Sequence, residues 1–148
     1  MRYLVTGVNG LVGKSVYDHI ISMGYLCVGT VRAAIPSEPK FKVFDLGKPE
    51  SLSNIVSDLS NTDVVIHCAA KLSVTGSNKK TKIEEYRNIN VNGTLLLARK
   101  AASLGVKRFV FLSTAKVHGA RTYNRIALEE SSDYNPPGAY ETAKAEAE

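Results

Sequence analysis

The sequence predicts an α/β protein built on a doubly wound parallel sheet. Five short apolar runs alternate with segments in which apolar residues recur at helical spacing. This alternation is typical of βαβ units, whose strands pair in parallel. A glycine-rich turn joins the first apolar run to the first helical segment. The 148 residues are 44% hydrophobic, which is enough apolar material for one core.

Each expected strand is rich in Val, Ile, Leu, Phe or Tyr and is bounded by turn residues. We expect strands at residues 2–6, 25–31, 41–44, 63–67 and 107–113. Apolar stripes predict three intervening helices, marked by Leu11, Val12, Val16 and Ile20, by Leu52, Ile55, Val56 and Leu59, and by the segment from Ile83 to Leu104. Gly24 and Gly105 stand where a helix commonly ends. A polar loop is expected over residues 114–138 and a last helix over residues 139–148.

Composition and charge exclude several classes of protein. The net charge is +5, but the short basic run over residues 79–82 predicts a solvated loop, so no nucleic-acid partner is expected. No apolar stretch is long enough for a membrane span, and the N-terminus is too polar for a signal peptide. We therefore expect a cytoplasmic protein with no membrane partner. Cys27 and Cys68 lie in apolar runs, which favours buried thiols over a disulfide or a metal site.

The turn after the first strand reads Gly7-x-x-Gly10-x-x-Gly13. Between a strand and a helix, such a motif is typical of a dinucleotide site. Gly7 would permit the tight turn, Gly10 would let backbone approach a pyrophosphate, and Gly13 would allow close packing of helix and sheet. The structural alternative is a turn that is merely tight.

The same segment ends in Gly13-Lys14-Ser15, which is also the end of a nucleoside-triphosphate loop. That loop needs a glycine at residue 8, where this sequence has Val8. It also needs a strand that ends in a magnesium-binding Asp, whereas Asp63 precedes its strand. The dinucleotide interpretation is therefore favoured.

Arg32 follows the second strand, where a dinucleotide site usually has an acidic residue for the ribose 2′-hydroxyl. An arginine there favours a 2′-phosphate and hence NADP. The alternative is a solvated strand end.

Tyr140 and Lys144 stand four residues apart on the last expected helix, and so on one face of it. A cation beside a phenol lowers the pKa of the phenol and suits it to proton transfer. Thr114 ends the fifth strand and would reach the carboxyl edge of the sheet, where ligands of such proteins bind. His67 ends the fourth strand and is expected to be a packed, hydrogen-bonded histidine rather than a base or a ligand.

Together these features resemble a known family. In order and spacing, the motifs are similar to the N-terminal part of the extended short-chain dehydrogenase/reductases, the NAD-dependent epimerase/dehydratase group. The motifs are Thr6-Gly7-x-x-Gly10-x-x-Gly13, Asp45-Leu46, His67-Cys68-Ala69-Ala70, Asn90-Val91-Asn92-Gly93-Thr94, Leu112-Ser113-Thr114-Ala115-x-Val117-x-Gly119 and Tyr140-x-x-x-Lys144.

The resemblance implies a Rossmann-fold NAD(P)-binding domain over residues 1–148, incomplete at its C-terminus because members of the family are longer. It implies NAD or NADP as cofactor, with Thr114, Tyr140 and Lys144 as the catalytic residues. Tyr140 would move the proton, Lys144 would hold the ribose, and Thr114 would orient the substrate oxygen. The residues expected at the cofactor, besides Arg32, Tyr140 and Lys144, are Gly7, Gly10, Leu11, Val12, Gly13, Asp45, Leu46, Ala69, Ala70, Lys71 and Asn90.

Residues 106–119 look closest to nucleotide-sugar 4-epimerases and 4-ketoreductases of surface-polysaccharide synthesis. The expected activity is hydride transfer at C4 of a UDP-sugar, with Tyr140 as general acid/base and a homodimer in the full-length protein. His118 departs from the pattern of the family, in which Tyr or Asn is usual. The alternatives are an NADPH-dependent carbonyl reductase similar to dihydroflavonol reductases and a non-catalytic dinucleotide-binding regulator. The 148 residues alone are expected to be inactive.

Overall fold

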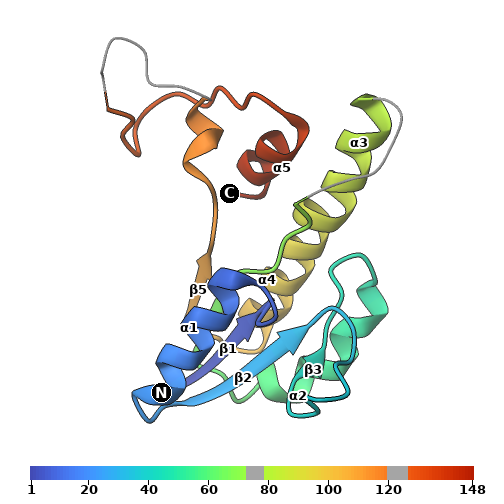
Figure 1. Cartoon of the computed structure of the whole chain (residues 1–148), viewed down its shortest axis with the longest axis vertical. Coiled ribbons are helices and arrows are strands. Elements are labelled where there is room, and N and C mark those ends of the chain that lie inside the picture. Colours follow the sequence, from blue (N-terminus) through green and yellow to red (C-terminus); the bar gives the residue numbers. More distant parts are fainter. Residues whose placement is uncertain (73–78, 120–126) are drawn as a thin grey trace.

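The computed structural model describes residues 1–72, 79–119 and 127–148. Its centre is a five-stranded sheet in the order β3-β2-β1-β4-β5, with every neighbouring pair parallel. The doubly wound parallel sheet is thereby confirmed (Figure 1). All five predicted strands are present, each at or inside its expected bounds. They are β1 (Arg2–Thr6), β2 (Leu26–Val31), β3 (Lys42–Val43), β4 (Val64–His67) and β5 (Arg108–Phe111).

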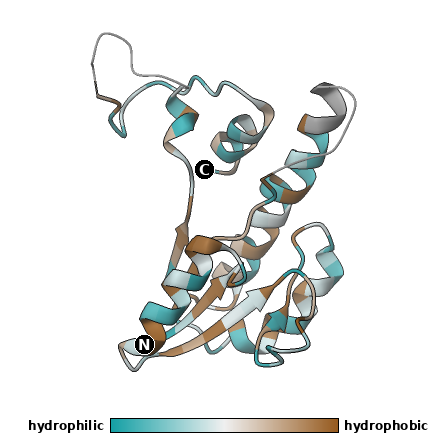
Figure 2. Cartoon of the chain, in the orientation of Figure 1, coloured by the Kyte–Doolittle hydropathy of each residue, from teal (hydrophilic) through white to brown (hydrophobic). Residues whose placement is uncertain are grey.

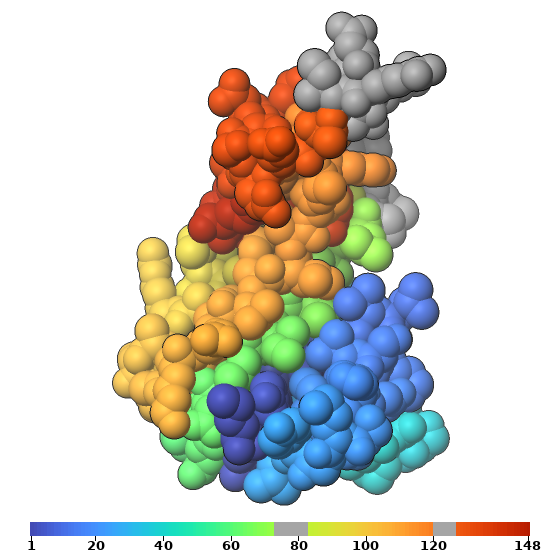
Figure 3. Space-filling model, turned by 90° about the vertical axis from the view of Figure 1, so that its left-hand side faces the viewer, coloured from blue at the N-terminus to red at the C-terminus, as the bar shows by residue number. Residues whose placement is uncertain are grey.

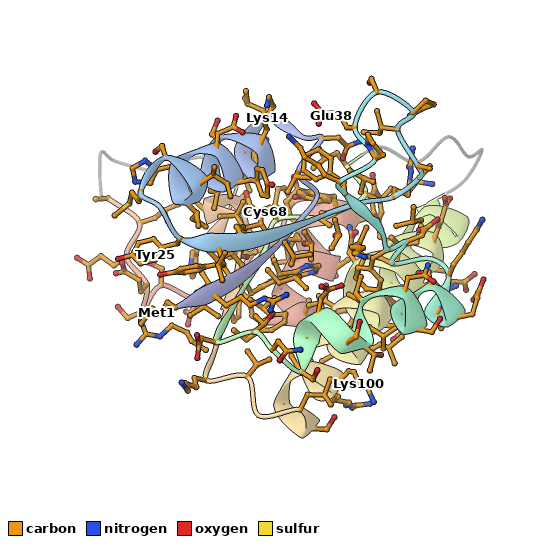
Figure 4. All side chains as sticks on the ribbon, turned by 90° about the horizontal axis from the view of Figure 1, so that it is seen from below. Met1, Lys14, Tyr25, Glu38, Cys68 and Lys100 are labelled. Atoms are coloured by element: carbon orange, nitrogen blue, oxygen red, sulfur yellow. The ribbon has the colours of Figure 1, made fainter. Side chains whose placement is uncertain are left out.

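Helices cover both faces of the sheet. In Figure 4, α1 lies on one face and α2 and α4 on the other, with Lys14 and Lys100 projecting away from the sheet on opposite sides. The helical segments are α1 (Leu11–Ser22), the 3-10 helix η1 (Pro49–Ile55), α2 (Val56–Leu59), α3 (Lys79–Tyr86), the π-helical η2 (Arg87–Asn92), α4 (Gly93–Ser103), the 3-10 helix η3 (Ala115–His118) and α5 (Ala139–Ala147).

Three expectations need correction. The second predicted helix is mostly 3-10, because η1 runs from Pro49 to Ile55 and only Val56–Leu59 is α-helical. The basic run expected as a loop at residues 79–82 forms the backbone of the first turn of α3. The cysteines Cys27 and Cys68 are free, as expected, but only half-buried. Residues 120–126, within the expected polar loop, lie outside the described residues.

The core has two layers, one on each face of the sheet. Leu4, Ile55, Leu59, Val65 and Leu97 are fully buried between the sheet and the α2 and α4 side. Val5, Val8, Ile20 and Val31 form the smaller cluster under α1. Apolar residues are concentrated in the strands and the adjoining helix faces, as Figure 2 shows. In the described part of the chain, no helix is both long and apolar enough to cross a membrane.

The register brings the carboxyl ends of the strands to one edge. Thr6, the last residue of β1, pairs with Thr30 on one side and His67 on the other. The chain winds from β1 to β2 in one direction and later returns to place β4 on the other side of β1. Ligands of open α/β sheets bind at such a switch point. Above this edge lie η3 and α5, and in Figure 1 they share the upper part of the molecule with α3; the same orange and red segments lie above the sheet in Figure 3.

Candidate functional site

The glycine turn is fixed by backbone contacts that only glycine permits. Gly7 has a φ of +72°, and a Cβ added to it would lie 2.9 Å from Cα of Ala69. Its N–H donates to the carbonyl of Thr30 at 2.9 Å, which ties the turn to the end of β2. The turn therefore lies against the segment that follows β4, and the two segments form one edge of the site.

Helix α1 packs on this turn at a distance that excludes any side chain at Gly13. A Cβ there would lie 2.2 Å from the carbonyl oxygen of Gly7. Gly10 is the N-cap of α1 and offers no side chain to its first N–H groups. Leu11 is 87% exposed and Val12 46%, although both are large apolar residues. The helix start therefore presents bare backbone donors beside an uncovered apolar surface, a combination that suits a phosphate carried on a larger ligand.

Arg32 directly follows β2 and is exposed at the same edge. No described residue forms an ion pair with it. Asp45 and Leu46, which follow β3, have partners of their own. The Asp45 carboxylate accepts the Gly47 N–H at 3.0 Å, and Leu46 is buried in the core, with its backbone against Gly93 of α4. Contact of these residues with an adenosine half stays a prediction.

The segment after β4 is held by residues of α3 and η2. Lys71 donates its N–H to Oδ1 of Asn90 at 2.7 Å, and its carbonyl accepts from Nδ2 of Asn90 at 2.9 Å. The Lys71 amine forms an ion pair with Glu85, and the hydroxyl of Tyr86 donates to the carbonyl of Leu72 at 3.0 Å. Asn90 is buried, and both the oxygen and the nitrogen of its side chain bond to this segment.

His67 is buried, as expected of a packed, hydrogen-bonded histidine. Its Nδ1 lies 2.7 Å from Oγ1 of Thr6, and its Nε2 lies 2.9 Å from Oγ1 of Thr94. Burial lowers the pKa of the imidazole to about 3, and the charge of Lys144 contributes to this lowering, so His67 is neutral at neutral pH.

Thr114 and Lys144 both lie at the segment that follows β5. Thr114 caps η3, where its Oγ1 accepts the Lys116 N–H at 3.4 Å. The Lys144 amine donates to the carbonyl of Leu112 at 2.6 Å and lies 3.8 Å from the ring centroid of Phe111. Lys144 is 2% exposed, and burial lowers the pKa of its amine to about 8.

The spacing argument for a lowered Tyr140 pKa was wrong for this structure. Burial raises the pKa of the Tyr140 phenol, and the charges of Glu141 and Tyr86 raise it further. The physical reason is that the Lys144 amine is directed to the carbonyl of Leu112 and not to the phenol. Tyr140 instead packs edge-on against Tyr86, with ring centroids 5.9 Å apart.

Sequence reasoning missed the residues that hold the site together. Arg87 forms a bidentate ion pair with Glu146, with Nε 2.8 Å from Oε2, and this links η2 to the helix that carries Tyr140. Tyr86 precedes Asn90 by four residues, so helical spacing was a usable signal for it. Glu85 gave no such signal. Its partner Lys71 is 14 residues earlier, and the sequence does not predict how the chain runs between the two.

Comparison with known proteins agrees with this geometry. The profile described as the NAD dependent epimerase/dehydratase family matches residues 3–148. The chain belongs to this family. A UDP-glucose 4-epimerase of Vibrio cholerae is 32% identical over 146 residues, which cover 98% of this chain and 44% of that protein. The chain thus spans less than half the length of this relative.

Two solved structures show the same fold. The UDP-glucose 4-epimerase of Thermus thermophilus in complex with NAD is 25% identical, with a TM-score of 0.81 over 98% of this chain and 48% of that one. The protein MoeE5, in complex with UDP-glucose and NAD, is 27% identical, with a TM-score of 0.81 over 99% of this chain and 46% of that one. The Rossmann fold expected from the sequence is therefore confirmed, and this chain corresponds to less than half the length of each of these two proteins.

Proposed function

We propose that residues 1–148 form the NAD(P)-binding domain of a longer nucleotide-sugar epimerase that acts at C4 of a UDP-sugar. The observation that carries this proposal is the junction of the glycine turn with the Ala69–Lys71 segment, at the edge where Thr114 follows β5 as the N-cap of η3. Membership of the family and the 32% identity to a UDP-glucose 4-epimerase support the substrate class.

The residues present fit a dinucleotide. A Cβ at Gly7 would press on Ala69 and one at Gly13 would press on Gly7, so these two glycines keep the turn tight against its neighbours. Gly10, as the N-cap, leaves the first N–H groups of α1 free of any side chain, and these donors suit an anion. Gly7, Gly10, Leu11, Val12 and Gly13 would hold the pyrophosphate. Residues 45–46 would flank the adenine, and residues 69–71, fixed by Asn90, would lie beside the nicotinamide half.

When bound, the dinucleotide supplies the hydride acceptor and donor, and the chain's own residues handle the proton. Tyr140 would transfer a proton at the phenol oxygen. Thr114 would orient the reacting oxygen of the sugar through its hydroxyl. Lys144 would hold the ribose through its amine, whose pKa burial lowers to about 8, so that the amine is still mostly protonated at neutral pH.

Substitution of Tyr140 by Phe in the full-length gene product tests this assignment. Loss of general acid/base catalysis lowers turnover of UDP-glucose or UDP-galactose by about 10²- to 10⁴-fold. Cofactor affinity, measured by calorimetry, stays within about twofold because the ring and its packing on Tyr86 remain. The matched control is Tyr25→Phe, at the opposite end of the sheet, which leaves both quantities unchanged. Full turnover by Tyr140→Phe would exclude the proposed role.

A second candidate is an NADPH-dependent carbonyl reductase, favoured by the exposed Arg32 at the end of β2. The two functions differ in how the cofactor is held. An epimerase returns the hydride to the same substrate, so protein purified without added cofactor releases NAD when it is denatured. A reductase exchanges its cofactor in each turnover, and its empty site would take up NADPH reversibly. A protein that binds neither dinucleotide would point to a different function.

We also propose that the full-length protein is a homodimer and that the 148 residues alone lack turnover, because the UDP-sugar pocket requires chain beyond them. Sedimentation of the full-length protein and an activity assay of the isolated 148 residues test these two statements. A monomer, or turnover by the isolated residues, would contradict them.

A further inference from the structure

His67 lies between the two segments proposed to contact the dinucleotide, yet it faces neither solvent nor the site. It is fully buried at the end of β4 and touches residues of three elements. Nδ1 meets Thr6 at the end of β1, and Nε2 meets Thr94 on α4. Its ring also stacks on Phe111 of β5, with centroids 5.9 Å apart. A purely space-filling role does not require two polar contacts of this length.

The proton positions follow from the partners. Thr6 Oγ1 accepts the backbone N–H of Ala69 at 3.0 Å, so one of its lone pairs is occupied. The hydroxyl proton of Thr6 needs an acceptor, because a buried donor without one is costly. Among the described residues, the acceptor within reach is Nδ1 of His67. This arrangement leaves the proton of the neutral imidazole on Nε2, from which it is donated to Thr94.

The chain of hydrogen bonds ends at the site itself. Thr6 immediately precedes Gly7, and Ala69 is the residue whose Cα would lie 2.9 Å from a Cβ at Gly7. The orientation of the Thr6 hydroxyl therefore determines the distance between the glycine turn and the Ala69–Lys71 segment. We propose that His67 is a positioning residue, which orients the Thr6 hydroxyl to receive the Ala69 N–H and so fixes the gap between these two segments.

This inference rests on the proposed function only in taking the ligand to be a dinucleotide. It predicts that cofactor affinity depends on an acceptor at the Nδ1 position and not on the stability of the fold. His67→Asn keeps an oxygen near that position, but it leaves a cavity and a buried amide in place of the ring. His67→Leu fills the space with apolar atoms and removes the acceptor. The two variants thus separate positioning from packing.

The experiment measures the dissociation constants of NADH and NADPH for the full-length gene product by calorimetry, together with its unfolding in urea. We expect His67→Leu to weaken binding about tenfold, and His67→Asn to stay within about threefold although it is the less stable variant. Thr94→Val is the matched control, because it removes a contact of the same imidazole on the side away from the site. Its affinity stays within about twofold.

Three results would overturn the proposal: equal affinities for His67→Leu and His67→Asn, affinities that follow the order of stability, or a loss with Thr94→Val as large as that with His67→Leu. Should His67→Leu not fold, Thr6→Val supplies the same comparison, with an expected loss of about tenfold against near-normal binding by Thr6→Ser. Failure of the unmodified protein to bind either dinucleotide would refute the proposed function instead.

Discussion

Replacing Gly13 by alanine sets two physical effects of opposite sign against each other. Within a helix, a Gly-to-Ala change ordinarily stabilises a protein by about 1 kcal/mol, because alanine loses less backbone entropy on folding. At Gly13 the added Cβ would lie 2.2 Å from the Gly7 carbonyl oxygen, 2.7 Å from the Gly7 carbonyl carbon and 3.2 Å from the Thr6 oxygen. These atoms are backbone, so no side-chain rotation relieves the contact.

The size of the clash decides whether Gly13→Ala raises or lowers the free energy of unfolding. Ordinary contact begins near 3.4 Å, so helix α1 would have to withdraw from the turn by about 1.2 Å. The turn does not follow freely, because the Gly7 N–H is bonded to Thr30 and the Gly7 carbonyl accepts the Gly10 N–H at 2.9 Å. Overpacking of this kind costs about 1 to 3 kcal/mol, and a broken turn hydrogen bond about 1 more. After the gain in helix propensity, the net loss is about 1 to 3 kcal/mol.

Urea unfolding of Gly13→Ala, compared with the wild-type protein, measures this loss. The control is a Gly-to-Ala comparison at Ser15, an exposed position on the same helix. There, the Ser15→Ala protein should be more stable than the Ser15→Gly protein by about 1 kcal/mol. Opposite signs at the two positions are expected, together with weaker dinucleotide binding by Gly13→Ala. A Gly13→Ala protein more stable than wild type would refute the reasoning from the close contact.

Two further predictions concern charge. Arg32→Ala should weaken NADPH binding about 10- to 100-fold and change NADH binding little, because the lost contact is to the 2′-phosphate; equal wild-type affinities for the two cofactors would contradict it. Because His67 has a pKa of about 3 in the folded chain and 6.5 ordinarily, the unfolded chain binds the extra proton between these values. The free energy of unfolding should therefore fall below pH 6.5 by up to about 1.4 kcal/mol per pH unit, and more steeply than in His67→Leu; parallel pH profiles would argue against a buried neutral His67.

The strands were predictable because each is a short run of β-branched and aromatic residues between turn signals, a pattern local to the sequence. The residues at which the strands end were not predictable, because a strand ends where its pairing with the neighbouring strand ends. β3 was expected over four residues, but its register with β2 joins only Lys42 to Thr30 and Val43 to Val31. Phe44 was expected in the same strand; its N–H still donates to the carbonyl of Val31 at 2.8 Å, but the paired register ends before it and its side chain lies in the core, where it is 3% exposed.

The long helix shows a second limit. Apolar periodicity predicted one helix from residue 83 to residue 104, and the chain is helical through nearly all of this range, but residues 87–92 are π-helical. The spacing of apolar residues is averaged over several helical turns, so it does not reveal a single π-helical turn. Within that turn lies Asn90, whose side chain bonds both backbone groups of Lys71 across 19 residues of sequence. A contact of this kind depends on the tertiary arrangement of β4 and η2, which no local pattern contains.

The proposed catalytic pair, Tyr140 and Lys144, shows which properties of a site the sequence spacing determines and which it does not. Four residues of helix place Tyr140 and Lys144 on one face, and this much followed from the sequence. The pKa of the phenol depends on the position of a single nitrogen atom, which lies at the carbonyl of Leu112 over the ring of Phe111. With its raised pKa, Tyr140 holds its proton at neutral pH and is set to donate rather than accept. Use of Tyr140 as a base would therefore require a cation nearer to the phenol than the Lys144 amine, which donates to the carbonyl of Leu112 in this structure.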